Sequence, residues 1–457
     1  MTDALPQRAV AEELAQRIGA LEPGRFPPAL KAKCVDLLID IVGLCVTARN
    51  QDYVKAALGG LDDDGPCTAI GHARGLTASG AALVNGTAAH GEDFDDTFEG
   101  GPIHAGVVIV PAVLAACERH RPDGSAALKG IAVGLEATCR MSLVVPKAVH
   151  KSGFHPTAVL GAMGAAAAVS AALGSTARQT VDALGIAGSM AGGIIEYLAE
   201  GAWTKRMHPG WAAQSGIRAA LMARAGFNGP RTVFEGTHGL YNGFAHTAKG
   251  DYDALIGDFG ERWVTETIAF KPYPCGTMTH PYVDCARRLK QRGIKASDIK
   301  EILCEVGEGT VHRLWEPLAA KQKPNNGYAG KFSTPYCIAS GFVRGGVGLE
   351  AFTDAAVKEP EVLALAAKVK YVVDPNNPYP NNYTGHMRAT MRDGSTIEER
   401  QPHLRGGAHE PLTGADIADK FARNVRHGGW DDKRATAALA AARGIFDGPV
   451  KLDAFKG

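Results

Sequence analysis

Segments rich in alanine and glycine follow one another through the first half of this chain, and they restrict its fold more than any other feature. Residues 157–173, 180–201 and 212–226 are rich in Ala, Met and Leu, and each segment ends at or just before a glycine, as helices often do. Residues 30–48 add apolar side chains at helical spacing. Because helices with small side chains approach one another closely, the chain up to about Gly260 is predicted to form a compact all-α bundle.

The sequence changes character after residue 270, where β-branched and alternating segments replace the small residues. Strands are predicted at 299–306 and 368–373, and residues 387–398 form a predicted hairpin with an Asp-Gly turn. Helices return in the tail, which is expected to rejoin the first domain, and a chain of 457 residues usually holds two domains. We therefore predict a mainly α fold. A large all-helical domain is expected at 1–264 with 406–457, and a smaller α/β domain at 265–405.

The charges of the chain nearly cancel, which excludes functions that depend on a strong field. Its 49 Lys and Arg residues face 48 Asp and Glu residues, so no global field attracts nucleic acid or an anionic membrane. Residues 1–19 mix both charges and are predicted to form an amphipathic helix, not a signal peptide. The apolar stretch 157–173 is too short and too rich in alanine to span a membrane. We expect a cytoplasmic protein.

Nine cysteines are scattered along the chain, and none forms a Cys-x-x-Cys pair. This spacing argues against a zinc ribbon or an iron–sulfur cluster, and it fits a reducing compartment. A single catalytic cysteine stays open, although no local signature indicates one. The sequence also lacks a Walker A loop, a Gly-x-Gly-x-x-Gly after a strand, His-Glu-x-x-His and Gly-x-Ser-x-Gly. Nucleotide-dependent and serine-hydrolase chemistry therefore have no support.

The stretch His90–His104 gathers groups that can move protons. Asp93, Asp95 and Asp96 lie within four positions, and they cannot all be buried in ionised form without partners. If the stretch is helical, Asp93 and Asp96 share a face with Thr97 nearby, while Asp95 points elsewhere. A solvated acidic turn or a helix cap would explain the aspartates alone. The flanking histidines favour a functional site, because aspartate commonly orients an imidazole or joins it in binding metal.

A further histidine stands at the start of a predicted helix. His155 is followed by Pro156, and proline is common in the first turn of a helix. The helix dipole disfavours a charged imidazole at this end, and a neutral imidazole suits a general base. A capping or hydrogen-bonding histidine is the simpler alternative.

Two other segments combine cations with histidines. Lys205 and Arg206 lead into His208-Pro209-Gly210 in an apolar surrounding, so we expect these charges to be paired or to lie at the edge of a cleft. Arginine binds a carboxylate through two hydrogen bonds, and lysine binds it as a point charge. Residues 271–280 add a lysine and a histidine at the predicted domain junction, and clefts between domains are favoured places for sites.

Together these motifs resemble the MmgE/PrpD family, which includes 2-methylcitrate dehydratase, cis-aconitate decarboxylase and iminodisuccinate epimerase. The matching segments occur in family order and cover most of the chain. They are Asp-Phe-Asp-Asp-Thr at 93–97 with His104 and Val-Val-Ile-Val-Pro at 107–111, Gly-Phe-His-Pro-Thr at 153–157, Lys-Arg-Met-His-Pro-Gly-Trp-Ala-Ala at 205–213, Phe-Lys-Pro-Tyr-Pro-Cys at 270–275 with His280, and Lys-Phe-Ser at 331–333 with Tyr336.

The resemblance implies a large helical domain built from both chain ends, a smaller α/β lid domain, a homodimer, and chemistry without a metal or other cofactor. By motif position, the residues that it places in catalysis are Asp93, Thr97, His104, His155, Lys205 and His280. The residues expected to bind substrate are Lys205, Arg206, Lys271 and Tyr336. Two departures affect the substrate: Ala105 stands where we expect proline, and the 98–103 loop is altered.

The leading hypothesis is a lyase that removes water from a hydroxylated di- or tricarboxylate such as 2-methylcitrate. The cations would hold carboxylates, either His104 or His155 would take the proton next to a carboxylate, and another acid would protonate the departing hydroxyl. Asp93 would orient a histidine or lysine, and Thr97 would bond the substrate or that aspartate.

Three alternatives stay open. Decarboxylation of a cis-aconitate-like acid and epimerisation of an iminodisuccinate-like acid need the same parts. Outside the family, a metal-dependent hydrolase would use His90, Asp93, Asp96 and His104 as ligands, although their spacing matches no known metal motif. The last alternative is a protein that binds carboxylates without turnover.

Overall fold

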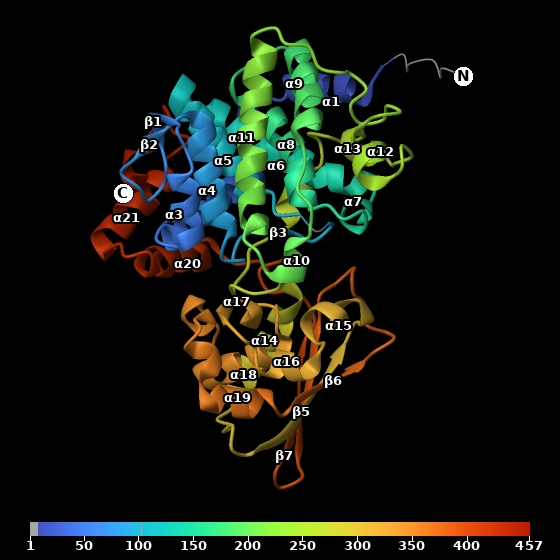
Figure 1. The fold of residues 1–457 in the computed structure, drawn as a ribbon, viewed down its shortest axis with the longest axis vertical. Coiled ribbons are helices and arrows are strands. Elements are labelled where there is room, and N and C mark those ends of the chain that lie inside the picture. The colour runs from blue at the N-terminus through green and yellow to red at the C-terminus, as the bar shows by residue number, and fades with distance from the viewer. Residues whose placement is uncertain (1–7, 102) are drawn as a thin grey trace. The chain divides into compact units, whose positions relative to one another are not determined.

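The computed structural model describes residues 8–101 and 103–457, and the chain divides into two compact units (Figure 1). Unit 1 comprises the described residues up to Gly91, Asp95–Ile268 and Thr413–Gly457. Unit 2 comprises Glu92–Phe94 and Ala269–Leu412. The three residues 92–94 thus belong to unit 2, although their neighbours on both sides belong to unit 1.

Unit 1 is a bundle of helices whose contacting faces carry small residues. Its central helices are α4 (Ala78–His90), α5 (Gly106–His120), α6 (Gly124–Val144), α8 (Pro156–Ala172) and α11 (Thr204–Arg224). Helix α8 packs against α6 and α11, which lie beside it in Figure 1, and α11 also packs against α4. A side chain on Gly86 of α4 would come within 2.7 Å of the Gly210 backbone in α11. The predicted mainly α fold is confirmed, and glycine is required where these helices touch.

The remaining helices of unit 1 surround this centre. They are α1 (Val10–Ala20), α2 (Pro28–Ala48), α3 (Asp52–Gly59), α7 (Ala148–Lys151), α9 (Ala177–Met190), α10 (Tyr197–Glu200), α12 (Leu240–Ala245), α13 (Asp253–Ile256), α20 (Gly414–His427) and α21 (Asp432–Arg443). The first part of the helix predicted at 1–19 lies outside the described residues. Unit 1 is not purely helical, because short strands β1 (Asp64–Thr68) and β2 (Gly75–Leu76) pair, as do β3 (Thr97–Phe98) and β4 (Ile268–Ala269).

Two helix predictions were wrong at their ends. The helix predicted at 180–201 ends at Met190, because Ala191 is extended and Gly193 takes a φ of 124°. The helix predicted from Ala212 already begins at Thr204 and includes Pro209. Since Pro209 stands early in α11, its missing N–H interrupts few helical hydrogen bonds. The membrane prediction can also be compared with the structure. Within the described ranges, no helix is long and apolar enough to cross a bilayer.

Unit 2 holds a four-stranded mixed sheet with the order β6-β5-β7-β8. The strands are β5 (Ile299–Val306), β6 (Val369–Val373), β7 (Gly385–Met391) and β8 (Thr396–Gln401). Strand β5 is parallel to β6 and antiparallel to β7. The predicted hairpin is β7–β8, and the Asp393 carboxylate accepts the Ser395 backbone N–H in its turn at 2.9 Å.

Helices cover one face of this sheet. They include α14 (His280–Gln291), which contacts β7 and β8, and α18 (Thr334–Arg344), which contacts β6. Four shorter helices complete the unit: α15 (Glu308–Leu314), α16 (Leu318–Gln322), α17 (Gly327–Gly330) and α19 (Pro360–Ala366). Burial alternates along β7, which is the pattern of a sheet with one covered face.

A buried ion pair attaches the C-terminal helix α20 to α2 in unit 1. The Lys420 ammonium lies 2.8 Å from one oxygen of Asp40 and 3.0 Å from the other, and both side chains are almost fully buried. Burial raises the pKa of Asp40, and the charge of Lys420 opposes this shift. Lys420 thus offsets part of the cost of burying the Asp40 carboxylate.

We predict that Lys420→Met destabilises unit 1 by roughly 3–5 kcal/mol, because it leaves a buried carboxylate without its cation. The free energy of unfolding in urea measures the effect, and Lys433→Met, at an exposed position of α21, is the matched control. The double variant Asp40→Asn/Lys420→Met should recover part of the loss. Equal stability of Lys420→Met and the control would contradict the prediction.

Candidate active site

The chain leaves α4 at Gly91 and runs through buried positions. Gly91 packs on the Tyr53 ring, which leaves no room for a side chain. Asp93 takes a φ of 53°, a strained conformation for aspartate, so the stretch is not a helix. Asp95 and Asp96 are fully buried. The helical face shared by Asp93 and Asp96 is therefore absent, and a solvated acidic turn does not describe these carboxylates.

Asp96 caps the start of α5. Its Oδ2 accepts a hydrogen bond from the Gly106 backbone N at 3.0 Å, and the Ala105 backbone also donates to the carboxylate. Proline in place of Ala105 would lack this N–H. Burial, followed by the charge of Asp95, raises the pKa of Asp96 to about 7, while the backbone hydrogen bonds lower it. For this aspartate, the helix-cap interpretation holds.

One carboxylate oxygen of Asp95 joins two histidines. It lies 2.8 Å from Nδ1 of His90 and 3.3 Å from Nδ1 of His104. The His104 Nδ1 also donates to the Asp96 carbonyl at 2.6 Å and lies 3.4 Å from the Thr97 hydroxyl. Because carboxylate and carbonyl oxygens only accept, both imidazoles carry hydrogen on Nδ1. The neighbouring carboxylate also stabilises an imidazolium.

His104 is the more accessible of these two histidines. Its side chain is 14% exposed, whereas that of His90 is fully buried. The His104 backbone N donates to the Thr157 hydroxyl at 3.1 Å, so the first turn of α8 holds it in place. His104 therefore combines a carboxylate partner with partial access to small molecules.

Helix α8 starts at a second histidine pair, as predicted for His155. His155 is the residue before the first helical turn, Pro156 follows it, and its backbone N donates to Gly193 O at 2.8 Å. Its Nδ1 lies 3.1 Å from Nδ1 of His208 in α11. The His155 ring also stacks on His90 at a centroid distance of 5.8 Å. Unit 1 thus brings four imidazoles together.

Burial keeps the His155–His208 pair neutral. It lowers the pKa of His155 well below its usual value, and the charges of His90, His208 and Lys205 act in the same direction. Burial also lowers the pKa of His208 to about 4, with further effects of His90 and Lys205. Desolvation is therefore the largest cause of the neutral state.

Lys205 and Arg206 stand in the first turn of α11, not in a turn before it. Lys205 is the cation whose charge reaches His155 and His208. The Arg206 guanidinium instead lies 4.4 Å above the Tyr53 ring. Of the two, Lys205 is the cation associated with the imidazole cluster.

In unit 2, two buried lysines hold the segment Glu92–Phe94. The Lys271 ammonium donates to the Asp93 carbonyl at 3.0 Å. The Lys331 ammonium donates to the Glu92 carbonyl at 2.6 Å and lies 2.7 Å from its carboxylate. The Lys271 contact is thus with a neutral carbonyl, whereas Lys331 also meets a carboxylate. Unit 2 thus fixes the backbone around the strained Asp93.

His280 and Tyr336 are fully buried in unit 2. The His280 Nε2 lies 3.1 Å from the Cys275 carbonyl, and its Nδ1 has no hydrogen-bond partner among the residues that the structure describes. The Tyr336 hydroxyl donates to the Ala351 carbonyl, and burial raises the pKa of Tyr336 to about 12. This hydroxyl is engaged in the interior of the unit.

Three of the described residues have the composition of a metal site: His90, Asp95 and His104, whose ligand atoms lie within 4.8 Å of one another. Asp93 and Asp96, expected as ligands of a hydrolase, do not belong to this group. Both imidazoles direct Nδ1 at the same carboxylate oxygen, and a metal bound there would have to displace these protons. Elemental analysis of the purified protein tests this alternative.

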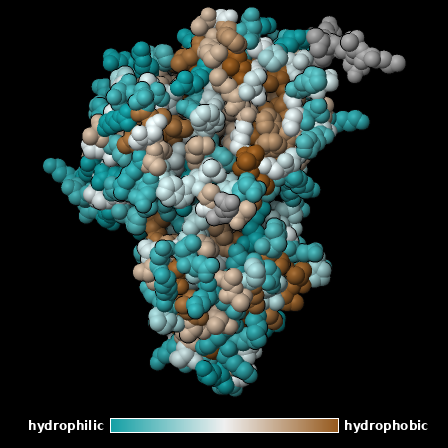
Figure 2. Space-filling model, viewed as in Figure 1, coloured by the Kyte–Doolittle hydropathy of each residue, from teal (hydrophilic) through white to brown (hydrophobic). Residues whose placement is uncertain are grey.

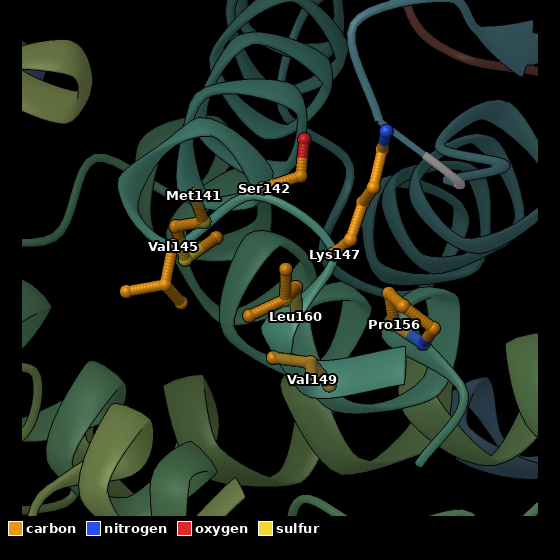
Figure 3. Close-up of a pocket in the computed structure, with 7 residues that line it drawn as sticks. All are labelled: Met141, Ser142, Val145, Lys147, Val149, Pro156 and Leu160. Carbon is orange, nitrogen blue, oxygen red and sulfur yellow. The ribbon is translucent and has the colours of Figure 1, made fainter. Parts of the chain in front are cut away.

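A small cavity lies beside the start of α8 (Figure 3). Its lining residues are Met141, Ser142, Val145, Lys147, Val149, Pro156 and Leu160. Figure 3 shows the Ser142 hydroxyl and the Lys147 ammonium extending toward the same side. None of the clustered histidines lines this cavity, and its single cation is a poor match for a di- or tricarboxylate. The imidazole cluster is the better candidate site.

Sequence reasoning missed four members of these groups. His90 was considered only as a metal ligand, Asp95 only beside the predicted site residues, and His208 and Lys331 only within motifs. For His208, the signal was a histidine directly before Pro-Gly in an apolar surrounding, where a polar side chain needs a buried partner. The partner itself, 53 residues away, had no signal in the sequence.

The chain belongs to the MmgE/PrpD family. The model of the MmgE/PrpD N-terminal domain matches residues 12–253, and that of the C-terminal domain matches residues 273–443. Together they cover most of the chain. It is therefore an enzyme of a family that acts on small carboxylic acids.

Several relatives of this chain carry the name of one particular reaction of the family. A cis-aconitate decarboxylase-like protein of Aspergillus oryzae is 27% identical over 445 residues, which is 92% of this chain and 91% of that protein. Human cis-aconitate decarboxylase is 30% identical over 359 residues, or 76% of this chain and 72% of that enzyme. The mouse enzyme of the same name is 29% identical over 362 residues, or 76% and 71%.

We predict that Asp96 makes stability depend on pH. Between about pH 4 and pH 7 the folded carboxyl keeps its proton while the unfolded one loses it, so stability falls as pH rises. The loss is on the order of 1.4 kcal/mol per unit of pKa shift. Asp96→Asn has no proton to lose, so its stability relative to the wild type should rise by a few kcal/mol over this range. Urea unfolding at several pH values measures it, and a constant difference would contradict the prediction.

Proposed function

We propose that this protein is a lyase that decarboxylates a small unsaturated tricarboxylate of the cis-aconitate type. The relatives named above support this reaction over dehydration of a 2-methylcitrate-like hydroxy acid, which the sequence had favoured. The observation that carries the proposal is a contrast between two nearby histidines. The Asp95 carboxylate lies against His104, whereas the His155 imidazole stays neutral. One group is thereby suited to donate a proton, and the other to bind without charge.

The reaction needs one proton and no oxidant. In cis-aconitate, one carboxylate stands on a methylene carbon next to the carbon–carbon double bond. When this group leaves as CO2, its bonding electron pair forms a new double bond to the neighbouring carbon. The original double bond then shifts its electrons to the far alkene carbon, which takes up a proton. The enzyme must supply that proton and hold two carboxylates.

His104 is the proposed proton donor. Asp95 stabilises its imidazolium, and the hydrogen bond from Nδ1 to the Asp96 carbonyl leaves Nε2 as the donating atom. Thr97 would position this ring, to which its hydroxyl is close. His155, neutral and buried, would hydrogen-bond a carboxylate. Asp93 and His280 stay in the proposed catalytic set, although their roles are not separated by these contacts.

Cations are the proposed substrate anchors. Lys205 would hold a carboxylate, since its charge lies near the histidines. Lys271 would do so as a second buried cation, which contacts the neutral Asp93 carbonyl. Arg206 and Tyr336 remain in the proposed binding set, with the condition that each first leaves its present partner.

The domain bounds 1–264 with 406–457 and 265–405 stay a prediction.

We expect cis-aconitate to be turned over with release of CO2, and 2-methylcitrate and iminodisuccinate not to be. In D2O, proton NMR should show one deuterium at the former alkene carbon of the product. Asp95→Asn should lower kcat by about 100-fold, the scale typical of general acid–base catalysis. Lys205→Ala should raise KM.

The matched control is His238→Gln, an exposed imidazole of unit 1 outside the cluster. Turnover of 2-methylcitrate alone would return the assignment to dehydration. Exchange of substrate protons without turnover of any candidate would indicate a binding protein or another substrate.

We also propose that the protein is a homodimer. Trp203, Met207 and Trp211 recur every fourth residue at the start of α11 and are 49%, 38% and 47% exposed, with Ile194 and Leu198 exposed nearby in the sequence. Figure 2 shows hydrophobic residues reaching the surface on the face that α11 presents. Exposed apolar stripes of this kind mark interaction sites.

The nine free, buried cysteines support a reducing compartment, and cytoplasmic localisation stays a prediction.

Sedimentation velocity should give a dimer for the wild type and a monomer for Trp211→Glu, because a buried unpaired charge opposes association. Phe227→Glu, at an exposed aromatic residue beyond the end of α11, is the control. A monomeric wild type at micromolar concentration would refute the dimer without affecting the proposed reaction.

A further inference from the structure

His155 and His208 form a pair whose contact has chemical consequences beyond packing. Their Nδ1 atoms are 3.1 Å apart, their ring centroids are 5.2 Å apart, and each residue is 4% exposed. Both imidazoles are neutral at pH 7 for the reasons given above. A neutral imidazole has one N–H and one bare nitrogen. A hydrogen bond between two Nδ1 atoms therefore contains a single hydrogen, which belongs to one ring or the other.

The position of this hydrogen decides the chemistry of His155. If His155 donates, its Nε2 is bare and accepts hydrogen bonds. If His208 donates, the hydrogen of His155 stands on Nε2, which becomes a donor. The partner's ring thus sets the tautomer of His155, as second partners of imidazoles generally do.

The fold holds both rings in this contact. The Gly193 carbonyl accepts the His155 backbone N–H, and the Gly193 φ of 124° suits a residue without a side chain. A side chain on Gly193 would come within 3.3 Å of the His208 ring and 2.6 Å of Ala158. On the other side, His208 is fixed in α11 next to Pro209 and Gly210. The loop after α9 and the start of α11 together hold the two rings against each other.

We propose that His208 is a positioning residue that donates its Nδ1 hydrogen to Nδ1 of His155 and so keeps the hydrogen of His155 on Nε2. The direction rests on the proposed function, because a bare Nε2 would repel the lone pairs of a carboxylate substrate, whereas Nε2–H donates to them. The charge of Lys205 supports the neutral form of His155, because a second cation beside this lysine is disfavoured. His155 then binds carboxylate as an uncharged donor.

Nitrogen-15 NMR of histidine-labelled enzyme tests the tautomers without any turnover. The expected result in the resting wild type is a protonated Nε2 on His155 and a protonated Nδ1 on His208, assigned from the signals lost in single variants. His208→Asn retains a donor near the Nδ1 position and should keep the His155 tautomer. His208→Asp, which only accepts when ionised, should move the hydrogen to Nδ1 of His155. A wild type with Nδ1–H on His155, or a His208→Asp variant with an unchanged tautomer, overturns the proposal.

Binding of propane-1,2,3-tricarboxylate, a saturated tricarboxylate that cannot lose CO2 in the proposed way, provides the second readout. His208→Leu should weaken its binding by roughly 10- to 100-fold, the scale of a hydrogen bond to a charged group. His208→Asn should stay within about threefold of wild type, well inside a single tenfold step. His238→Leu is the control for loss of an imidazole elsewhere. Equal weakening by Asn and Leu would indicate a packing role and overturn the proposal.

The NMR and binding measurements separate the proposed role of His208 from the proposed reaction. Failure of cis-aconitate turnover together with the expected tautomers and binding would refute the proposed reaction and leave the role of His208 intact. If His208→Leu does not fold, the wild-type spectrum and the Asn and Asp variants still decide. Turnover of cis-aconitate with the opposite tautomer would refute the role of His208 alone.

Discussion

The burial of two adjacent carboxylates, Asp95 and Asp96, is the constraint on which the arrangement of unit 1 depends. A buried carboxylate needs hydrogen-bond donors, and each of the two obtains a different set. Asp96 takes the backbone N–H groups at the start of α5, which fixes where that helix begins. Asp95 takes two imidazoles. Burial, followed by the charge of Asp95, raises the pKa of Asp96, so the fold disfavours two charged carboxylates side by side.

Helix packing then determines the surroundings of the imidazoles. His90 ends α4, His104 precedes α5, His155 precedes α8 and His208 lies near the start of α11. Each is therefore at a helix end, and the close approach of small-residue helices brings those ends together. The same close packing excludes water, which keeps His155 and His208 neutral. Histidines with different partners and different access thus lie in one cluster.

Membership of the MmgE/PrpD family does not by itself select a reaction. Dehydration, decarboxylation and epimerisation of small carboxylic acids all use cations for carboxylates and a group that handles one proton. The Ala105 N–H donates to Asp96, which a proline at this position could not do. It strengthens the helix cap directly behind His104.

The sequence by itself determined the elements whose signals are local. The apolar period, the glycines after helices and Pro156 predicted the helical bundle and the start of α8, and strand β5 falls on the predicted residues 299–306. The sequence also indicated the acidic and cationic segments from which the candidate site is built.

Only the tertiary structure decided how those groups pair. It placed Asp95, and not Asp93 or Asp96, between two histidines, ended α9 before Gly193, and set His208 against His155 across 53 residues of chain. Such contacts depend on the distance between packed helices, which no local spacing records. Hydrogen bonds within a turn follow from neighbouring residues, whereas the position of a proton shared between two helices follows from the fold.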